Sequence, residues 1–235
     1  MKNLSIITLS VLALLIASCK KTVDDPTPMD YVSYFSFNGN PNDAKSGTNP
    51  VSTLNVTLTK DKNGKENSAY LFTGNSYLQF PVPSAKNTFT YSVWASPSVM
   101  SFNGSLNTVF SVGSQGGDQL IALANNYYNS NGWSLTSYNS DATNVGINTG
   151  TLPDVNTWHH LVMTRDNDNF KAYVNGKLLG TKTITGKTAG YGTDTPKFYI
   201  GNRHTGQGFT GIIDELRIYD RALTEQEIQT LYTNY

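Results

Sequence analysis

The chain contains one cysteine, Cys19, among its 235 residues. A disulfide needs two thiols, so no disulfide framework within the chain can hold this fold together. Zinc sites that use several cysteines are excluded for the same reason. The stability of the folded chain must come from a hydrophobic core, and the chain is long enough to bury a sizeable one.

Charge is also scarce, because Asp, Glu, Lys and Arg make up 14% of the sequence and the formal net charge is zero. No basic tract favours nucleic acid as a partner. Only four residues are glutamate, and no Glu-x-Asp-x-Glu pattern supplies the close carboxylate pair that retaining glycosidases need. Asp166 and Asp168 have a suitable spacing, but they lie between two expected strands, where a hairpin turn is favoured.

Nucleophilic catalysis finds no support either. No Gly-x-Ser-x-Gly elbow occurs, and the histidines are His159, His160 and His204. The first two are neighbours in an expected strand, so their side chains point to opposite faces and cannot serve one site together. We therefore expect no enzymatic activity.

The apolar run at residues 4–17 is too short to span a membrane as a helix. It follows Lys2 and ends in Ile16-Ala17-Ser18-Cys19, with small residues before a cleavage point, as in a secretory signal peptide. This ending resembles a bacterial lipobox, which implies cleavage before Cys19 and acylation of Cys19, with palmitate as one acyl chain. With more than one chain the anchor is stable. An ordinary signal peptide with an incidental cysteine is the alternative.

The expected organisation is a signal peptide at residues 1–18, a tether at 19–30 and one domain at 31–235. The tether is polar and contains Pro26 and Pro28, which favours an extended linker. Asp24 and Asp25 resemble the surface-export signals of Bacteroidetes lipoproteins, and Lys20 favours the outer membrane. We expect a lipid-anchored outer-membrane protein, exposed at the cell surface if that export signal operates.

Period-two alternation of apolar residues predicts many short strands. They are expected at residues 68–73, 77–80, 88–95, 108–112, 119–124, 133–138, 158–165, 170–174, 178–184, 197–200 and 211–219. Asn175-Gly176 predicts a type I′ hairpin turn, because both residues tolerate positive φ. The pattern predicts an all-β protein, a sandwich of two antiparallel sheets with a short C-terminal helix.

The C-terminal segment is the most informative part of the sequence. Ile212, Leu216 and Ile218 share one face of a period-two strand, and Asp214 falls on the same face. A buried carboxylate needs donors, a cation or a metal. Thr224 and Glu227 then form a capping box for a helix with an apolar stripe.

This ending resembles the C-terminal signature of LamG-like jelly-roll domains, which are relatives of the concanavalin A-like lectins and glucanases. Other similar segments lie at residues 34–40, 61–74, 89–94 and 158–175. Together the similarity covers residues 31–235 and implies a jelly-roll sandwich. The resemblance also implies one structural calcium ion, for which Asp214 and Asp43 are the candidate ligands. Hydrogen bonds from backbone amides or a tyrosine to Asp214 are the alternative.

Residues 125–141 are rich in tyrosine, tryptophan and asparagine, a composition suited to stacking on sugar rings and bonding their hydroxyls. The predicted carbohydrate-binding residues are Tyr127, Tyr128, Trp133 and Tyr138, with Tyr191 and His204, near Arg203, on a second rim. Trp133 as a core residue is the alternative.

We therefore expect a non-catalytic, lipid-anchored binding module of the cell envelope, monomeric, with a polysaccharide or host glycan as its ligand. A protein-interaction or adhesion domain is the alternative function. The sequence does not decide between them, because function depends on the site rather than on the scaffold.

Overall fold

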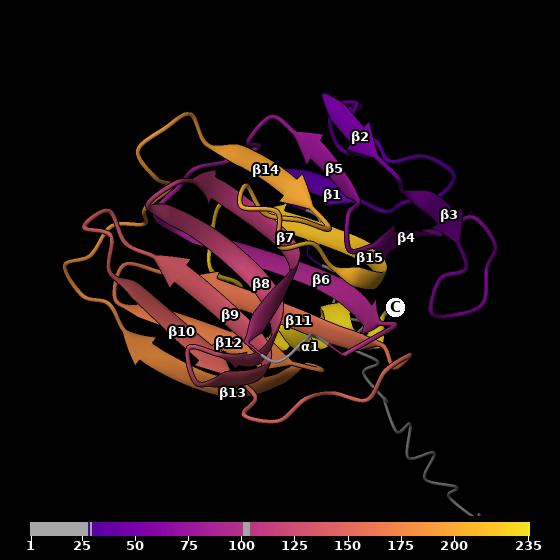
Figure 1. Ribbon diagram of the computed structural model, residues 1–235. Coiled ribbons are helices and arrows are strands. Elements are labelled where there is room, and N and C mark those ends of the chain that lie inside the picture. Colours follow the sequence, from indigo (N-terminus) through magenta and orange to yellow (C-terminus); the bar gives the residue numbers. More distant parts are fainter. Residues whose placement is uncertain (1–27, 29, 101–103) are drawn as a thin grey trace, which may run out of the picture.

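A computed structural model describes residue 28, residues 30–100 and residues 104–235. The described chain forms two β-sheets and one helix (Figure 1). The strands are β1 (Ser33–Phe35), β2 (Ser52–Leu54), β3 (Thr57–Thr59), β4 (Ala69–Thr73), β5 (Tyr77–Phe80), β6 (Phe89–Pro97), β7 (Ser105–Ser114), β8 (Gly117–Tyr127), β9 (Ser130–Tyr138), β10 (Asn144–Asn148), β11 (His159–Arg165), β12 (Asn169–Val174), β13 (Lys177–Thr183), β14 (Lys197–Ile200) and β15 (Thr210–Tyr219), and the helix is α1 (Glu225–Thr233).

The two sheets stack as a sandwich. Sheet A runs β13-β12-β11-β6-β15-β4-β3, with β1 also paired to β15, and sheet B runs β10-β9-β8-β7-β14-β5-β2. Neighbouring strands in both sheets are antiparallel. The predicted all-β jelly-roll sandwich with a short C-terminal helix is confirmed.

Alternating side chains from the inner faces of both sheets form the core. Sheet B contributes Trp133 and Leu135 from β9, and sheet A contributes Leu161 and Met163 from β11. Arg165 is buried between the sheets, where its guanidinium donates to side chains of β9 and of the residues that follow it. The side chains on the outer face of each sheet take no part in this core.

Strand β15 departs from the predicted period. Glu215 has φ 53°, and the pairing with β6 shifts between Asp214 and Arg217, which marks a β-bulge. The bulge moves Ile213 into the core beside Leu216, while Asp214 lies opposite Trp94 on the other face. The prediction that Asp214 shares the apolar face of Leu216 is therefore wrong, because one extra residue inverts the alternation before it.

The outer face of sheet A is covered by α1, which lies behind that sheet in Figure 1. Ile228 and Leu231 pack onto Val162, Tyr173 and Tyr219 of the sheet. The predicted capping box is confirmed: the Thr224 hydroxyl accepts from the Glu227 amide at 3.2 Å, and the Glu227 carboxylate accepts from the Thr224 amide at 2.8 Å. The helix thus closes this face of the sandwich.

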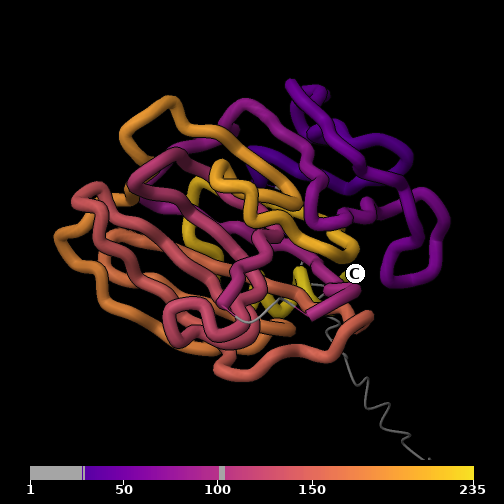
Figure 2. The backbone as a smooth tube through the Cα atoms, viewed as in Figure 1, coloured from indigo at the N-terminus to yellow at the C-terminus, as the bar shows by residue number. Residues whose placement is uncertain are grey.

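The chain enters the domain on the same side as α1. The Tyr219 hydroxyl donates to the Pro28 carbonyl at 3.1 Å, and the Arg221 guanidinium binds the Asp30 carboxylate. Strand β1, in the indigo part of the chain in Figure 2, pairs with β15 near the yellow end of the chain. The outer face of sheet B lies on the opposite side of the sandwich.

Local turn chemistry agrees with the sequence. Asn175 and Gly176 have φ of 51° and 74°, so the predicted type I′ hairpin joins β12 to β13. Asp166 accepts from the amides of Asp168 and Asn169, so this segment is a turn, as expected. Among the described residues, no helix is long and apolar enough to cross a membrane.

Candidate functional site

The outer face of sheet B carries a groove of about 650 Å³ over strands β7 to β10. Its lining residues belong to strands β7 to β10, apart from Tyr128 and Arg203, which lie in loops. They are Leu106, Leu120, Tyr127, Tyr128, Ser130, Ser134, Thr136, Tyr138, Asn144, Gly146, Asn148 and Arg203. The strand part of the groove reflects the period-two pattern, in which one face of a strand packs inside and the other lies open.

Strands β9 and β10 show this alternation most clearly. In β9, Ser134 and Thr136 line the groove, while Trp133 and Leu135 lie in the core. In β10, the sequence NVGIN places asparagine, glycine and asparagine outward and valine and isoleucine inward. The groove therefore presents hydroxyl and amide groups, which both donate and accept hydrogen bonds.

The apolar part of the groove comes from β7 and β8. Leu106, Leu120, Ala122 and Ala124 form a small cluster on the outer face. Tyr127 and Tyr138 pack against this cluster, which fixes an aromatic ring at each of two places along the groove. An apolar floor beside hydroxyls and amides suits a ligand with both apolar and polar faces.

The hairpin between β8 and β9 presents the most exposed aromatic ring of the groove. Tyr128 is 86% exposed, and its ring meets Tyr127 edge-on with the centroids 4.7 Å apart. Tyr128 and Asn129 have φ of 46° and 61°. A tyrosine in the left-handed region is uncommon, and such strain concentrates at functional sites.

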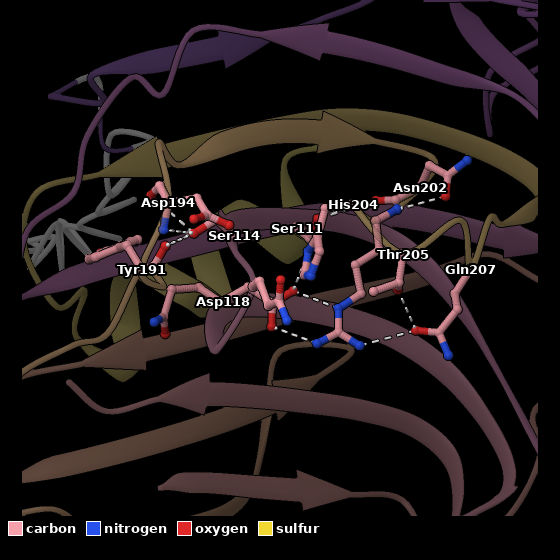
Figure 3. A network of polar contacts seen from close by, with 12 residues as sticks. Ser111, Ser114, Asp118, Tyr191, Asp194, Asn202, His204, Thr205 and Gln207 are labelled. Carbon is pink, nitrogen blue, oxygen red and sulfur yellow. Dashed lines mark hydrogen bonds and ion pairs between the residues drawn. The ribbon is translucent and has the colours of Figure 1, made fainter. Parts of the chain in front are cut away.

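Arg203 borders the groove and is held by a buried acid (Figure 3). Its Nε donates to one oxygen of Asp118 at 2.6 Å and its Nη2 to the other at 3.0 Å. Asp118 is fully buried, and the Arg203 side chain is 13% exposed. Burial opposes the charge on Arg203, but the bonds to Asp118 outweigh it and raise the pKa of Arg203.

The same arginine ties the glycine-rich loop after β14 to the groove wall. Nη1 of Arg203 donates to Gln207 at 3.0 Å, and the Gln207 amide lies 3.5 Å from the Tyr127 hydroxyl. His204 Nδ1 lies 3.8 Å from the Asp118 carboxylate, and burial lowers the pKa of His204. Figure 3 shows His204 beside Asp118 and Gln207 on the far side of the guanidinium that Asp118 binds.

The structure brings some of the predicted binding residues together and separates others. Tyr127, Tyr128 and Tyr138 all line the groove. Trp133 is 1% exposed and packs in the core against His159 and Phe209, so its assignment to the surface is wrong. Its side chain points inward because Ser134 and Thr136 take the outward positions of β9.

Of the predicted second rim, Tyr191 and His204 do not line this groove. The Tyr191 hydroxyl donates to the Lys86 carbonyl at 2.6 Å, and its ring packs against the core. His204 lies beside Arg203 but outside the lining. Arg203, which the sequence analysis placed beside His204 on this rim, does line the groove.

The predicted calcium ligand Asp43 is held by the protein itself. One oxygen accepts from the amides of Tyr34 and Lys45 at 3.0 and 2.9 Å, and the other from the hydroxyls of Ser33 and Ser46 at 2.8 Å each. Burial opposes ionisation, but these four donors outweigh it and lower the pKa of Asp43. The four bonds account for its position without a metal.

The second predicted ligand, Asp214, lies under the C-terminal end of the chain. It accepts from the Tyr235 hydroxyl and, at 2.8 Å, from the Glu215 amide. Burial raises its pKa to about 8, against the effect of the Tyr235 hydrogen bond. These two contacts match the alternative given in the sequence analysis, in which a tyrosine or backbone amides donate hydrogen bonds to Asp214. Among the described residues, no group of three or more acidic, histidine or cysteine side chains is placed to hold a metal.

Several groove residues were missed by the sequence reasoning. Asn144, Gly146 and Asn148 belong to β10, a strand that was not predicted. Ser134 and Thr136 lie in a predicted strand, but no feature marked them as site residues. The alternation of Asn144-Val145-Gly146-Ile147-Asn148 is the signal that identifies both the strand and its outward face. Cys19, the predicted acylation site, lies outside the described residues.

Comparison with known families gives a match over most of the domain. The Laminin_G_3 family model, described as the concanavalin A-like lectin/glucanases superfamily, matches residues 72–229. The adhesion G-protein coupled receptor V1 of Danio rerio is 25% identical over 161 residues. That alignment covers 64% of this chain but 2% of the receptor.

Solved structures with the same fold include one domain of an arabinanase and two toxin binding domains. Domain 4 of AbnA, a GH43 extracellular arabinanase from Geobacillus stearothermophilus, was solved with arabinotriose; it is 23% identical with TM-score 0.66, covering 87% of this chain and 98% of that one. The binding domain of Paraclostridial Mosquitocidal Protein 1 is 18% identical with TM-score 0.66, and that of botulinum neurotoxin serotype D is 12% identical with TM-score 0.67. The chain covers 52% of each of these two structures, which cover 88% and 87% of it. At these identities the likeness shows the fold.

Proposed function

This chain belongs to the concanavalin A-like lectin/glucanases superfamily, and from this premise we propose that it is a non-catalytic module that binds carbohydrate. The observation that carries the proposal is the groove on sheet B, where tyrosine rings lie beside hydroxyl and amide groups. Sugars offer apolar C–H faces to rings and hydroxyls to polar side chains. The arabinotriose in domain 4 of AbnA adds support from the same fold.

The absence of acids along the groove supports a binding role. None of its described lining residues is Asp or Glu. Hydrolysis of a glycosidic bond needs two carboxylates flanking it. The nearest buried acid on this face, Asp118, is held by both of its oxygens to Arg203.

We expect Tyr128→Ala to weaken binding to a responsive polysaccharide about tenfold, as truncating an aromatic hot spot does. The side chain is 86% exposed, so its loss leaves the fold intact. Tyr77→Ala is the matched control, because Tyr77 lies on sheet B outside the groove lining. The measurement is calorimetric titration of a glycan panel, with melting curves for both variants.

Equal affinities of the two variants would move the site away from this groove. A folded protein that binds no glycan would favour the alternative, a protein-adhesion domain, which is supported by the similarity to the adhesion receptor.

We further propose that the module is lipid-anchored through Cys19 and exposed at the outer membrane. Residues 28 and 30 are bound on the α1 side of the sandwich, and the groove lies on the other side. An anchor that precedes them would leave the groove facing away from the membrane. Labelling of expressing cells with radioactive palmitate should mark the wild type and not Cys19→Ala; equal labelling would remove this part of the proposal.

A further inference from the structure

The electrostatics of the groove restrict its ligand. Among the described lining residues, Arg203 is the sole side chain that is charged at neutral pH. The Asp118 carboxylate neutralises it through two hydrogen bonds, and its Nη1 also donates to Gln207. An anionic ligand would find no unpaired cation here, and a cationic ligand no unpaired acid.

The polar groups between the aromatic rings suit hydroxyls. Ser130, Ser134 and Thr136 offer hydroxyl groups, and Asn144 and Asn148 offer amides. Hydroxyls and amides donate as well as accept, which matches the hydroxyl groups of a neutral sugar. Ionised carboxylates or sulfates on a ligand accept only and would leave the acceptor atoms of the lining without donors.

The length of the groove along β9 indicates the length of the ligand, because the lining includes residues from Ser130 to Tyr138. Tyr127 pairs with Ser130 at one end of β9, and Tyr138 lies at the other end. Eight residue steps separate Ser130 from Tyr138, which corresponds to about 26 Å along the strand. One sugar ring fills a small part of this length, whereas a chain of several sugars can follow β9 from one end to the other.

We infer that the groove binds several consecutive units of an uncharged, extended polysaccharide chain. The inference rests on the proposed carbohydrate-binding function and adds the charge and the length of the ligand. The polysaccharide lies along β9. It contacts the Tyr127 and Tyr128 pair at one end and Tyr138 at the other, and it forms hydrogen bonds with the hydroxyls and amides between them.

The test compares neutral polymers, namely linear arabinan, xylan and mixed-linkage β-glucan, with anionic polygalacturonate and alginate. The full-length protein is titrated with each polymer at low and high salt, and then with a length series of oligosaccharides from the polymer that binds. We expect a neutral polymer to bind, with less than about a twofold change in affinity with salt, because no net charge is screened. Affinity should rise at least about tenfold from the monosaccharide to oligosaccharides that span both rings.

Two variants test where the ends of the bound polysaccharide lie. Tyr128→Ala and Tyr138→Ala should each weaken long oligosaccharides about tenfold. A disaccharide should respond to no more than one of them, because it cannot reach both. Tyr138→Phe keeps the ring that packs against the outer-face cluster of β7 and β8 and should keep the affinity, so it controls for disturbed packing.

Each contrary result has a distinct meaning. Salt-sensitive binding of an anionic polymer, or a monosaccharide that binds as tightly as the polymer, would overturn this inference while the binding function stands. A folded protein that binds none of these polymers would overturn both. Loss of disaccharide binding in both tyrosine variants would reject the placement along β9.

Discussion

Asp118→Asn is expected to lower the free energy of unfolding by about 3 to 5 kcal/mol, the usual cost of breaking a buried ion pair from one side. Asp118 is fully buried and binds Arg203 through both oxygens, at 2.6 and 3.0 Å. The amide removes the negative charge and leaves the guanidinium, 13% exposed, without a counter-ion. Urea unfolding at neutral pH measures the change.

Two controls separate the loss of the pair from a general effect of losing an acid. Glu66→Gln removes an exposed carboxylate, paired to Lys60 at the surface, and should change the stability by no more than about 0.5 kcal/mol. The double variant Asp118→Asn with Arg203→Gln removes both charges and should cost less than the sum of the single changes. A cost for Asp118→Asn no larger than that for Glu66→Gln would contradict the role given to this pair.

The fold could be predicted where alternation and turn chemistry act locally. Strands at residues 77–80 and 197–200 were predicted at their observed bounds, because each has alternating side chains and clear ends. The Asn175-Gly176 turn and the capping box at Thr224 depend on a few neighbouring residues and were predicted as well. Local rules were sufficient for these elements.

Strand β15 shows where a local rule fails. A strict period of two places Asp214 with Leu216, but Glu215 adopts a left-handed conformation and adds a residue. No glycine marks the bulge, and its cause is tertiary: the Glu215 carboxylate accepts from the Tyr34 hydroxyl at 2.7 Å and pairs with Arg217. Contacts with a residue 181 positions earlier cannot be read from the pattern of one strand.

The groove was predicted only in part, because long-range contacts also bring its residues together. The aromatic composition of residues 125–141 indicated a site, and three of its four named rings line the groove. Composition could not say which face Trp133 occupies. The asparagines of β10 and Arg203 reach the same groove through the pairing order β10-β9-β8-β7 and the loop after β14, which involve long-range contacts.

The buried Asp214 should make the protein less stable as the pH rises from about 4 to about 8. Its folded-state pKa is raised from 3.8 to about 8, chiefly by burial. In that window the unfolded chain releases the proton that the folded chain keeps, so the stabilisation present below pH 4 is lost as the pH approaches 8. At 1.36 kcal/mol for each unit of pKa, this group contributes at most about 6 kcal/mol.

Asp214→Asn should remove most of this pH dependence. The amide keeps the shape of the side chain: its carbonyl can accept from the Glu215 amide and its NH2 group can donate to the Tyr235 hydroxyl oxygen, but it has no proton to lose in this pH range. The variant should match the wild type near pH 4 and exceed it in stability at pH 8, with Glu66→Gln as the exposed-acid control. Urea unfolding of the three proteins at pH 4, 6 and 8 measures the difference.

Parallel pH profiles for wild type and Asp214→Asn would contradict the prediction. They would show that Asp214 is ionised in the folded protein, so that the Tyr235 hydroxyl holds a buried carboxylate at neutral pH.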